Sequence, residues 1–429
     1  MVTAKDNRGH LISEPTAEQL EILRAELRQL EEADPKKFSF GHVIVPRSGI
    51  WQNELVSAFA LGRAQCESAS RYLRNPKREL LFAIAQNDTP NAWAISCGEF
   101  DAVLITSGFW LKLRKRAAWL VEAMRVRAIK QALPKDSFQA SFLNDFANGL
   151  QGRLRQLHMI LVQTATNYIL GHEFGHLASG HLVFATASES AVDKHGFHAI
   201  DSAAEGLSKS SMHQAMELDA DVQGMAWAKN MIATARPSDE SEGVQGTGAL
   251  LRWIQADPLR VNFVSLTGAL LAFGTLGAKG FSIGALYKER SHPPTSLRAK
   301  LLVDTQTIAT NAARPDLAER NSAYAKEALL AAGLGVAYEF MNKLDKNHPE
   351  SAQVRTYLEQ ADFDDLAETT VEEMGLAAPT PKRRRMLDYY VTALALRWQA
   401  LSPQCAPRAR WQPGYTTPWT TINLRQNRR

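Results

Sequence analysis

Cysteine is scarce in this chain, and its scarcity argues against two classes of protein. Among 429 residues there are 3 cysteines, and Cys66, Cys97 and Cys405 lie far apart with no paired spacing. A disulfide-stapled secreted domain and a metal cluster held by thiolates both need several closely spaced cysteines. The sequence therefore indicates neither of them, and a reducing cytoplasm is the compartment that we expect.

An excess of charge of one sign is also missing. The formal net charge is +4 and the isoelectric point is near 8.8, which is too little over this length to indicate a nucleic-acid partner. Hydrophobic residues make up 45% of the chain and charged residues 22%, which is typical of a protein with a large buried core. The first residues contain no apolar run, so we expect no secretory signal.

Long apolar runs are missing too, with one exception. Residues 261–278 are uncharged and mostly apolar, and their length meets the lower limit for crossing a bilayer. However, the run contains Asn262, Ser265, Thr267 and three glycines, as expected of a helix that packs inside a large domain. We expect a buried helix and a cytoplasmic protein, and membrane association through this run stays open as the alternative.

Local patterns predict an α+β protein that is predominantly helical. Thr16 and Gln19 fit a capping box ahead of leucines at helical spacing, which predicts an amphipathic helix over residues 16–33. Short apolar runs, and two strand-like stretches on either side of Gly98-Glu99, predict a small sheet within residues 43–109. From residue 292 to about residue 399 the pattern is helical, and a proline-rich, irregular tail follows.

The segment LGHEFGHLASGH, residues 170–181, carries the strongest chemical signal. Residues four apart lie on one helical face, so His172 and His176 can bind one zinc ion together. Glu173 lies beside the first ligand and can reach a metal-bound water without ligating the metal. Ordinary histidines on a structural helix are the alternative interpretation.

A catalytic zinc ion needs a third protein ligand, and a second predicted helix offers one. Glu217 and Asp221 are four residues apart in MELDADVQGMAWA, so they share a face. We expect Glu217 to bind the metal and Asp221 to hydrogen-bond the ring of a ligating histidine. His181 is a rival ligand, which we rank below Glu217 because its offset of five residues from His176 does not fit the metzincin spacing.

These motifs resemble the gluzincin peptidases of the HtpX and CAAX-prenyl-protease group. The segment NDTPNAWAISCGEFDAVLITSGF is similar to the strand pair of that group, ELDAD to its Glu-x-x-Ala-Asp signature, and SHPPTSLR to its His-Pro-Pro segment with a following arginine. The phage-exclusion protein Lit and its relatives are a close alternative. The resemblance implies a zincin-like metallopeptidase core with a small sheet before the zinc helix, and one Zn²⁺ per chain. It covers residues 80–302, and the multiple membrane spans of the HtpX group are absent.

The resemblance also assigns residues around the predicted metal. Beside Glu173 as the base, it implies that His292 donates to the oxyanion and that Arg298 supports it. The alternative is that the His-Pro-Pro segment only begins a helix. The strand that contains Asn91, Ala92, Ala94 and Gly98 would take up the substrate as an added strand, unless it belongs to an interior hairpin.

The sequence thus predicts a zinc-dependent endopeptidase of the HExxH gluzincin type, acting on protein or peptide substrates. The resemblance suggests a role in protein quality control or phage defence. We divide the chain into an N-terminal amphipathic helix (1–37), a zinc metallopeptidase core (38–302) and a helical C-terminal region with an irregular tail (303–429). A non-catalytic zinc-binding interaction module is the alternative function, and the oligomeric state stays open.

Overall fold

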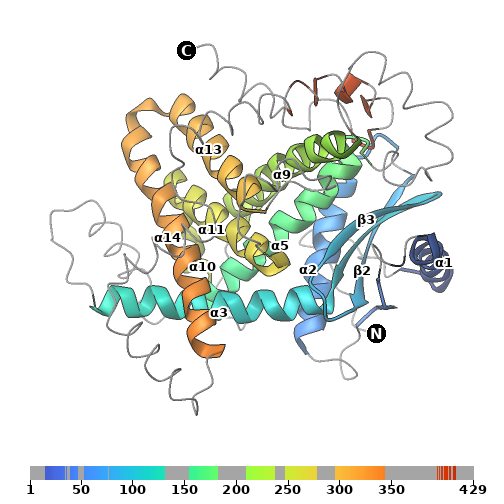
Figure 1. The fold of residues 1–429 in the computed structure, drawn as a ribbon, viewed down its shortest axis with the longest axis horizontal. Helices are drawn as coiled ribbons and strands as arrows, with labels where there is room; N and C mark the ends of the chain where they lie inside the picture. Colours follow the sequence, from blue (N-terminus) through green and yellow to red (C-terminus); the bar gives the residue numbers. More distant parts are fainter. Residues whose placement is uncertain are drawn as a thin grey trace. The chain divides into compact units, whose positions relative to one another are not determined.

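The computed structural model describes most of the chain. The described ranges are 15–33, 39–46, 53–75, 77–130, 154–181, 209–236, 247–277 and 295–343, with Pro35 and several positions between 394 and 411. These residues form a mostly helical protein with one small mixed sheet, as the sequence predicts (Figure 1).

The chain divides into two compact units, each assembled from separate stretches. The first unit contains Met1–Lys112, Ile169–Gly224 and Leu394–Thr420, and the second contains Leu113–Tyr168, Met225–Ala393 and Thr421–Arg429. This division follows contacts between residues. The three consecutive functional segments predicted from the sequence stay a prediction.

The sheet of the first unit has four strands in the order β1-β2-β4-β3. These are β1 (His42–Ile44), β2 (Glu79–Gln86), β3 (Ala92–Cys97) and β4 (Phe100–Thr106). β2 and β4 pair in parallel, whereas β1 and β3 are antiparallel to their neighbours. β2 and β4 are the central strands, and they are buried along nearly their whole length because both faces of the sheet are covered.

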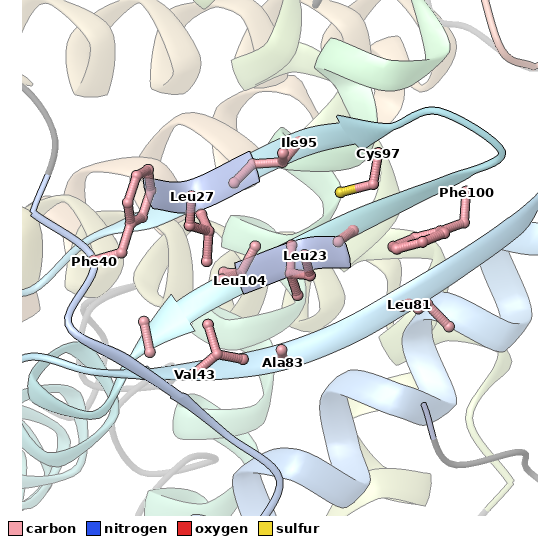
Figure 2. Packing of buried hydrophobic residues seen from close by; sticks show 12 residues of the cluster. Leu23, Leu27, Phe40, Val43, Leu81, Ala83, Ile95, Cys97, Phe100 and Leu104 are labelled. Atoms are coloured by element: carbon pink, nitrogen blue, oxygen red, sulfur yellow. The ribbon is translucent and has the colours of Figure 1, made fainter. Parts of the chain in front are cut away.

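Helix α1 (Ala17–Ala33) covers one face of this sheet. Its capping box is formed as predicted, because the Thr16 amide donates to Gln19 Oε1 at 2.9 Å and the Gln19 amide donates to Thr16 Oγ1 at 3.1 Å. Leu23 and Leu27 pack from α1 onto a cluster of strand residues (Figure 2). The strand members of the cluster alternate along β2 and β4, as the pleat requires.

The opposite side chains of β2 face a second helix, α2 (Asn53–Ser70). The rings of Phe59 and Phe82 lie 6.0 Å apart, and Gly62 leaves the space that the Phe82 ring fills. The sheet is therefore the centre of a three-layer arrangement, with α1 on one side and α2 on the other.

A buried ion pair fixes the end of the sheet where β3 turns into β4. Arg78 donates to both carboxylate oxygens of Asp101, at 2.7 and 2.6 Å, and Asp101 is fully buried. The same guanidinium donates to the carbonyls of Gly98 and Phe100 at the turn. Gly98 has a φ of +66°, which explains why glycine occupies the turn that the sequence predicted there.

Three long helices follow the sheet along the chain. They are α3 (Ser107–Lys130), which begins directly after β4, α5 (Leu154–Ala178) and α9 (Lys209–Thr234). α5 contains the predicted zinc motif, and α9 contains the predicted third ligand.

The second unit is a helical assembly around an apolar helix, α11 (Pro258–Gly277). α10 (Thr247–Gln255), α13 (Thr295–Ala313) and α14 (Ala318–Lys343) pack against α11, and a short helix, η1 (Pro315–Leu317), precedes α14. Asn262 donates to Thr310 Oγ1 and Asn321 Oδ1, which accounts for a polar residue inside the apolar run.

Among the described helices, α11 alone is long and apolar enough to cross a membrane. Its apolar window is 89% buried inside the protein. Such burial is the pattern of a core helix, which agrees with the buried helix expected from residues 261–278.

Candidate metal centre

The predicted zinc motif lies on the last two turns of α5. His172 and His176 are one turn apart, their rings meet edge-on with centroids 4.7 Å apart, and their Nε2 atoms are separated by 3.1 Å. Two Nε2 atoms at this distance point to a common position, as the spacing of the motif predicts.

Helix α9 contributes a carboxylate to the same position. Glu217 Oε2 lies 3.5 Å from His172 Nε2, and Glu217 Oε1 lies 3.5 Å from His176 Nε2. The three side chains form a group of donor atoms all within 4.8 Å of one another. We call these three residues the metal triad.

The spacing of the metal triad fits a zinc ion. Zinc in proteins is tetrahedral with metal–nitrogen bonds of about 2.0–2.1 Å, which makes neighbouring ligand atoms about 3.3–3.4 Å apart. The two Nε2 atoms, 3.1 Å apart, come close to this value, and each of them has a different carboxylate oxygen of Glu217 at 3.5 Å. Two imidazoles and one carboxylate are also a donor set that zinc prefers, and they leave a fourth position for a water molecule or a substrate.

A glycine lets α5 and α9 approach closely enough to form the triad. A Cβ atom at Gly175 would lie 3.0 Å from the Cα atom of Ala220 and 2.9 Å from the Cβ atom of Gln223. Such distances are too short for ordinary carbon contacts. Gly175 therefore sets how near Glu217 comes to the two histidines.

Asp221 contacts the first histidine, and its supporting role stays a prediction. Its Oδ1 atom lies 3.0 Å from Nδ1 of His172, on the side of the ring away from the triad. Burial by itself would lower the pKa of His172, but hydrogen bonds to Asp221 and Glu217 outweigh burial and raise this pKa to about 10. The metal-free site thus holds a proton on His172 at neutral pH, and a bound cation would have to replace it.

His181, the rival ligand considered from the sequence, lies outside the triad. Its Nδ1 atom is 3.0 Å from Nδ1 of His176, on the side of that ring away from the metal position. Its Nε2 atom lies 3.5 Å from Oδ2 of Asp219, and Ser179 Oγ donates to the same oxygen at 2.7 Å. Burial raises the pKa of Asp219 to about 7, against the opposing hydrogen bonds from Ser179 and Gln223.

The end of α5 explains the position of His181. Gly180 has a φ of +77°, the amide of Gly180 donates to the carbonyl of Leu177, and the amide of His181 donates to the carbonyl of His176. This is the Schellman arrangement, which turns the chain back over the last turn of the helix. As a result, the side chain of His181 lies against the imidazole ring of His176, five residues earlier in the chain.

The C-terminal stretch of the first unit packs on the same end of α5. The ring of Trp398 meets His181 edge-on at 4.9 Å, and the ring of Trp411 lies 6.4 Å from Phe174. The amide of Arg410 donates to the carbonyl of Leu177 at 3.1 Å. The sequence alone indicates no role for these residues, since no local pattern links them to α5.

Two of the three predicted catalytic residues, Glu173 and Arg298, lie among the described residues. Glu173 follows His172 on α5 and is 7% exposed, and its role as a base stays a prediction. Arg298 belongs to the second unit, where its guanidinium lies 5.2 Å from the centre of the Phe273 ring. His292 lies outside the described residues, so the predicted oxyanion role of both residues stays a prediction.

The predicted substrate strand lies at the edge of the described sheet. β3 pairs with β4 alone among the described strands, which agrees with an edge and not with an interior hairpin. Ala92 and Ala94 belong to β3, Asn91 precedes it and exchanges hydrogen bonds with Thr106, and Gly98 forms the turn after it. Whether this edge accepts a substrate stays a prediction.

No protein-family model, curated protein or solved structure matches the chain. The function proposed below therefore rests on the geometry of the site and on the sequence motifs that form it.

Proposed function

We propose that this protein is a zinc-dependent endopeptidase that hydrolyses peptide bonds of protein or peptide substrates. The observation that carries the proposal is the convergence of His172, His176 and Glu217 from two helices, with Asp221 behind the first histidine. Two imidazoles, a carboxylate and a supporting second carboxylate form the ligand pattern of zinc hydrolases.

The order of the elements supports a gluzincin core of the kind seen in HtpX and the CAAX prenyl proteases, or in the Lit proteins. Strands β3 and β4 precede the helix with the two histidines, and a later helix supplies the third donor. The base, Glu173, is present beside the first ligand, and a protein that only bound zinc would not need it. This favours the peptidase over the non-catalytic zinc module.

In this proposal each residue has a separate task. A zinc ion at such a site polarises a peptide carbonyl and lowers the pKa of a water molecule. Glu173 accepts a proton from the attacking water and delivers it to the leaving amine, as the carbon–oxygen bond forms and the carbon–nitrogen bond breaks. Asp221 accepts a hydrogen bond from Nδ1 of His172, which keeps the lone pair of Nε2 available to the metal.

The substrate would bind as an extra strand along β3. An edge strand offers unpaired backbone groups to an extended peptide, and these groups bind any sequence in the same register. His292 and Arg298 are proposed to stabilise the negative charge of the carbonyl oxygen. The proposed compartment is the cytoplasm.

The test compares the wild-type protein with Glu173→Gln, because glutamine keeps the size of the side chain and removes the base. We expect both proteins to bind about one zinc ion per chain, and only the wild type to create new N-termini when it is incubated with a whole-cell extract. Mass spectrometry of the N-termini identifies the substrates without a prior guess, and wild-type protein treated with a chelator is the control for contaminating proteases.

Equal cleavage by both proteins would show that Glu173 is not the base. Zinc binding without cleavage by either protein would instead favour the non-catalytic zinc module.

A further inference from the structure

We propose that His181 is a positioning residue for the metal ligand His176, and that Asp219 and Ser179 orient His181 in turn. The inference rests on the proposed metal site and deepens it, because it gives the second histidine a support as specific as the one that Asp221 gives to the first.

The contact between the two histidines allows only one direction of hydrogen bonding. A neutral imidazole has one N–H group and one lone pair. If His176 binds a metal through Nε2, its proton is on Nδ1, which lies 3.0 Å from Nδ1 of His181. Nδ1 of His181 must then accept, and the proton of His181 is on its Nε2 atom.

The surroundings of His181 match this assignment. Its Nε2 atom faces Oδ2 of Asp219 at 3.5 Å, which is long for a hydrogen bond but places an acceptor on the side where the proton must be. Ser179 donates to the same oxygen at 2.7 Å and so fixes the carboxylate in place. The hydrogen bond between the two imidazoles therefore has one direction, and the far nitrogen of His181 faces a buried carboxylate at 3.5 Å, outside hydrogen-bond geometry.

Packing holds His181 in this orientation. The side chains of His181 and Asp219 are 2% and 3% exposed, whereas those of His176 and Glu217 are 14% and 11% exposed. The Schellman turn at Gly180 fixes the backbone of His181, and the edge-on ring of Trp398 limits rotation of its imidazole. A histidine buried to this degree beside a ligand has few other orientations available.

The two ligating histidines are thus supported differently. His172 contacts a carboxylate directly, at 3.0 Å, whereas His176 reaches one only through the imidazole of His181. Support of this kind raises the basicity of a ligand and fixes its ring, and its loss usually costs about 10–100-fold in metal affinity. We expect His181 to contribute within this range.

The test replaces His181 by leucine and by asparagine in the full-length protein and measures zinc affinity by competition with a chromogenic chelator. Asparagine can place its Oδ1 atom where Nδ1 of the histidine lies, so it can still accept from His176, whereas leucine cannot. We expect His181→Leu to lower zinc affinity about 10–100-fold and His181→Asn to retain most of the wild-type affinity. The visible spectrum of the cobalt-loaded proteins should change with leucine and not with asparagine.

The outcomes separate this inference from the proposed peptidase. Equal losses in the two variants would mean that His181 only fills space, and unchanged affinity in His181→Leu would mean that it does not support the ligand. Either result overturns the inference while the wild type can still bind zinc and cleave. A wild-type protein that binds zinc but cleaves nothing would instead refute the proposed peptidase. The difference in zinc affinity between His181→Leu and His181→Asn would then still test the role of His181. Circular dichroism checks that both variants fold.

Discussion

Replacing Gly175 by alanine should weaken zinc binding without unfolding the protein. Gly175 lies on α5 where this helix crosses α9, and the new methyl group would lie 3.0 Å from the Cα atom of Ala220. Ordinary carbon contacts are about 3.5–4.0 Å, so the helices would have to separate locally by roughly 0.5–1 Å. The Cα atom of Ala220 belongs to the backbone of α9, so it cannot move aside as the end of a flexible side chain can.

The metal triad is sensitive to a displacement of this size. Glu217 is held by α9 and the two histidines by α5, and metal–ligand distances tolerate only about ±0.2 Å. We therefore expect zinc affinity to fall by at least about tenfold, or about 1.4 kcal/mol. Overpacking costs about 1–3 kcal/mol, but alanine is a better helix former than glycine by about 1 kcal/mol. The net loss in the free energy of unfolding should thus be small.

Chelator competition measures the affinity, and urea unfolding of the metal-free protein measures the stability. Gly62→Ala is the matched control, because it also adds a methyl group inside a helix, 2.3 Å from the buried ring of Phe82. We expect this control to lose more stability than Gly175→Ala and to keep wild-type zinc affinity in its folded fraction. Wild-type affinity in Gly175→Ala would refute the idea that the helix crossing sets the geometry of the site.

Two further predictions concern charge. The pKa of His172 in the metal-free protein is raised to about 10, above the unfolded value near 6.5, so its stabilising effect is complete below about pH 6.5 and is lost as the pH rises toward 10. Urea unfolding between pH 7 and 9.5 should show this decline, at most about 1.4 kcal/mol per pH unit, and His172→Ala should remove it. Arg78→Ala should reduce the free energy of unfolding by up to about 3–5 kcal/mol, because the buried Asp101 would lose its bidentate partner and keep Arg410, at 3.6 Å, beside it. Thermal unfolding checks this, and a loss below about 1 kcal/mol, as for a surface pair, would contradict it.

The sequence predicted those parts of the fold and site that depend on local patterns. The capping box at Thr16 and Gln19 needs only residues three apart, and it forms as expected. The two histidines need only one helical turn between them, and their shared direction follows from helix geometry. Glu217 lies on a different helix, so its place in the triad followed from the chemistry of zinc and from the resemblance, and the structure agrees.

Contacts that depend on a special backbone conformation, or on residues far apart in the chain, could not be predicted in this way. From its spacing, His181 was a rival metal ligand. Its actual position, beside Nδ1 of His176, depends on the left-handed conformation of Gly180, which the spacing does not reveal. No local pattern indicates that Asp219 is buried, yet it is 2% exposed and accepts a hydrogen bond from Ser179. Trp398 is more than two hundred residues from the motif, and only the folded chain brings it to His181.

Zinc K-edge X-ray absorption on the zinc-loaded protein would show directly whether the metal triad holds the ion. We predict about one zinc per chain, four nitrogen or oxygen neighbours at about 2.0–2.1 Å, and outer-shell scattering from two imidazoles that drops to one in His176→Ala. A protein that retains no zinc, or a spectrum with a sulfur neighbour or no change in that variant, would contradict the proposed site.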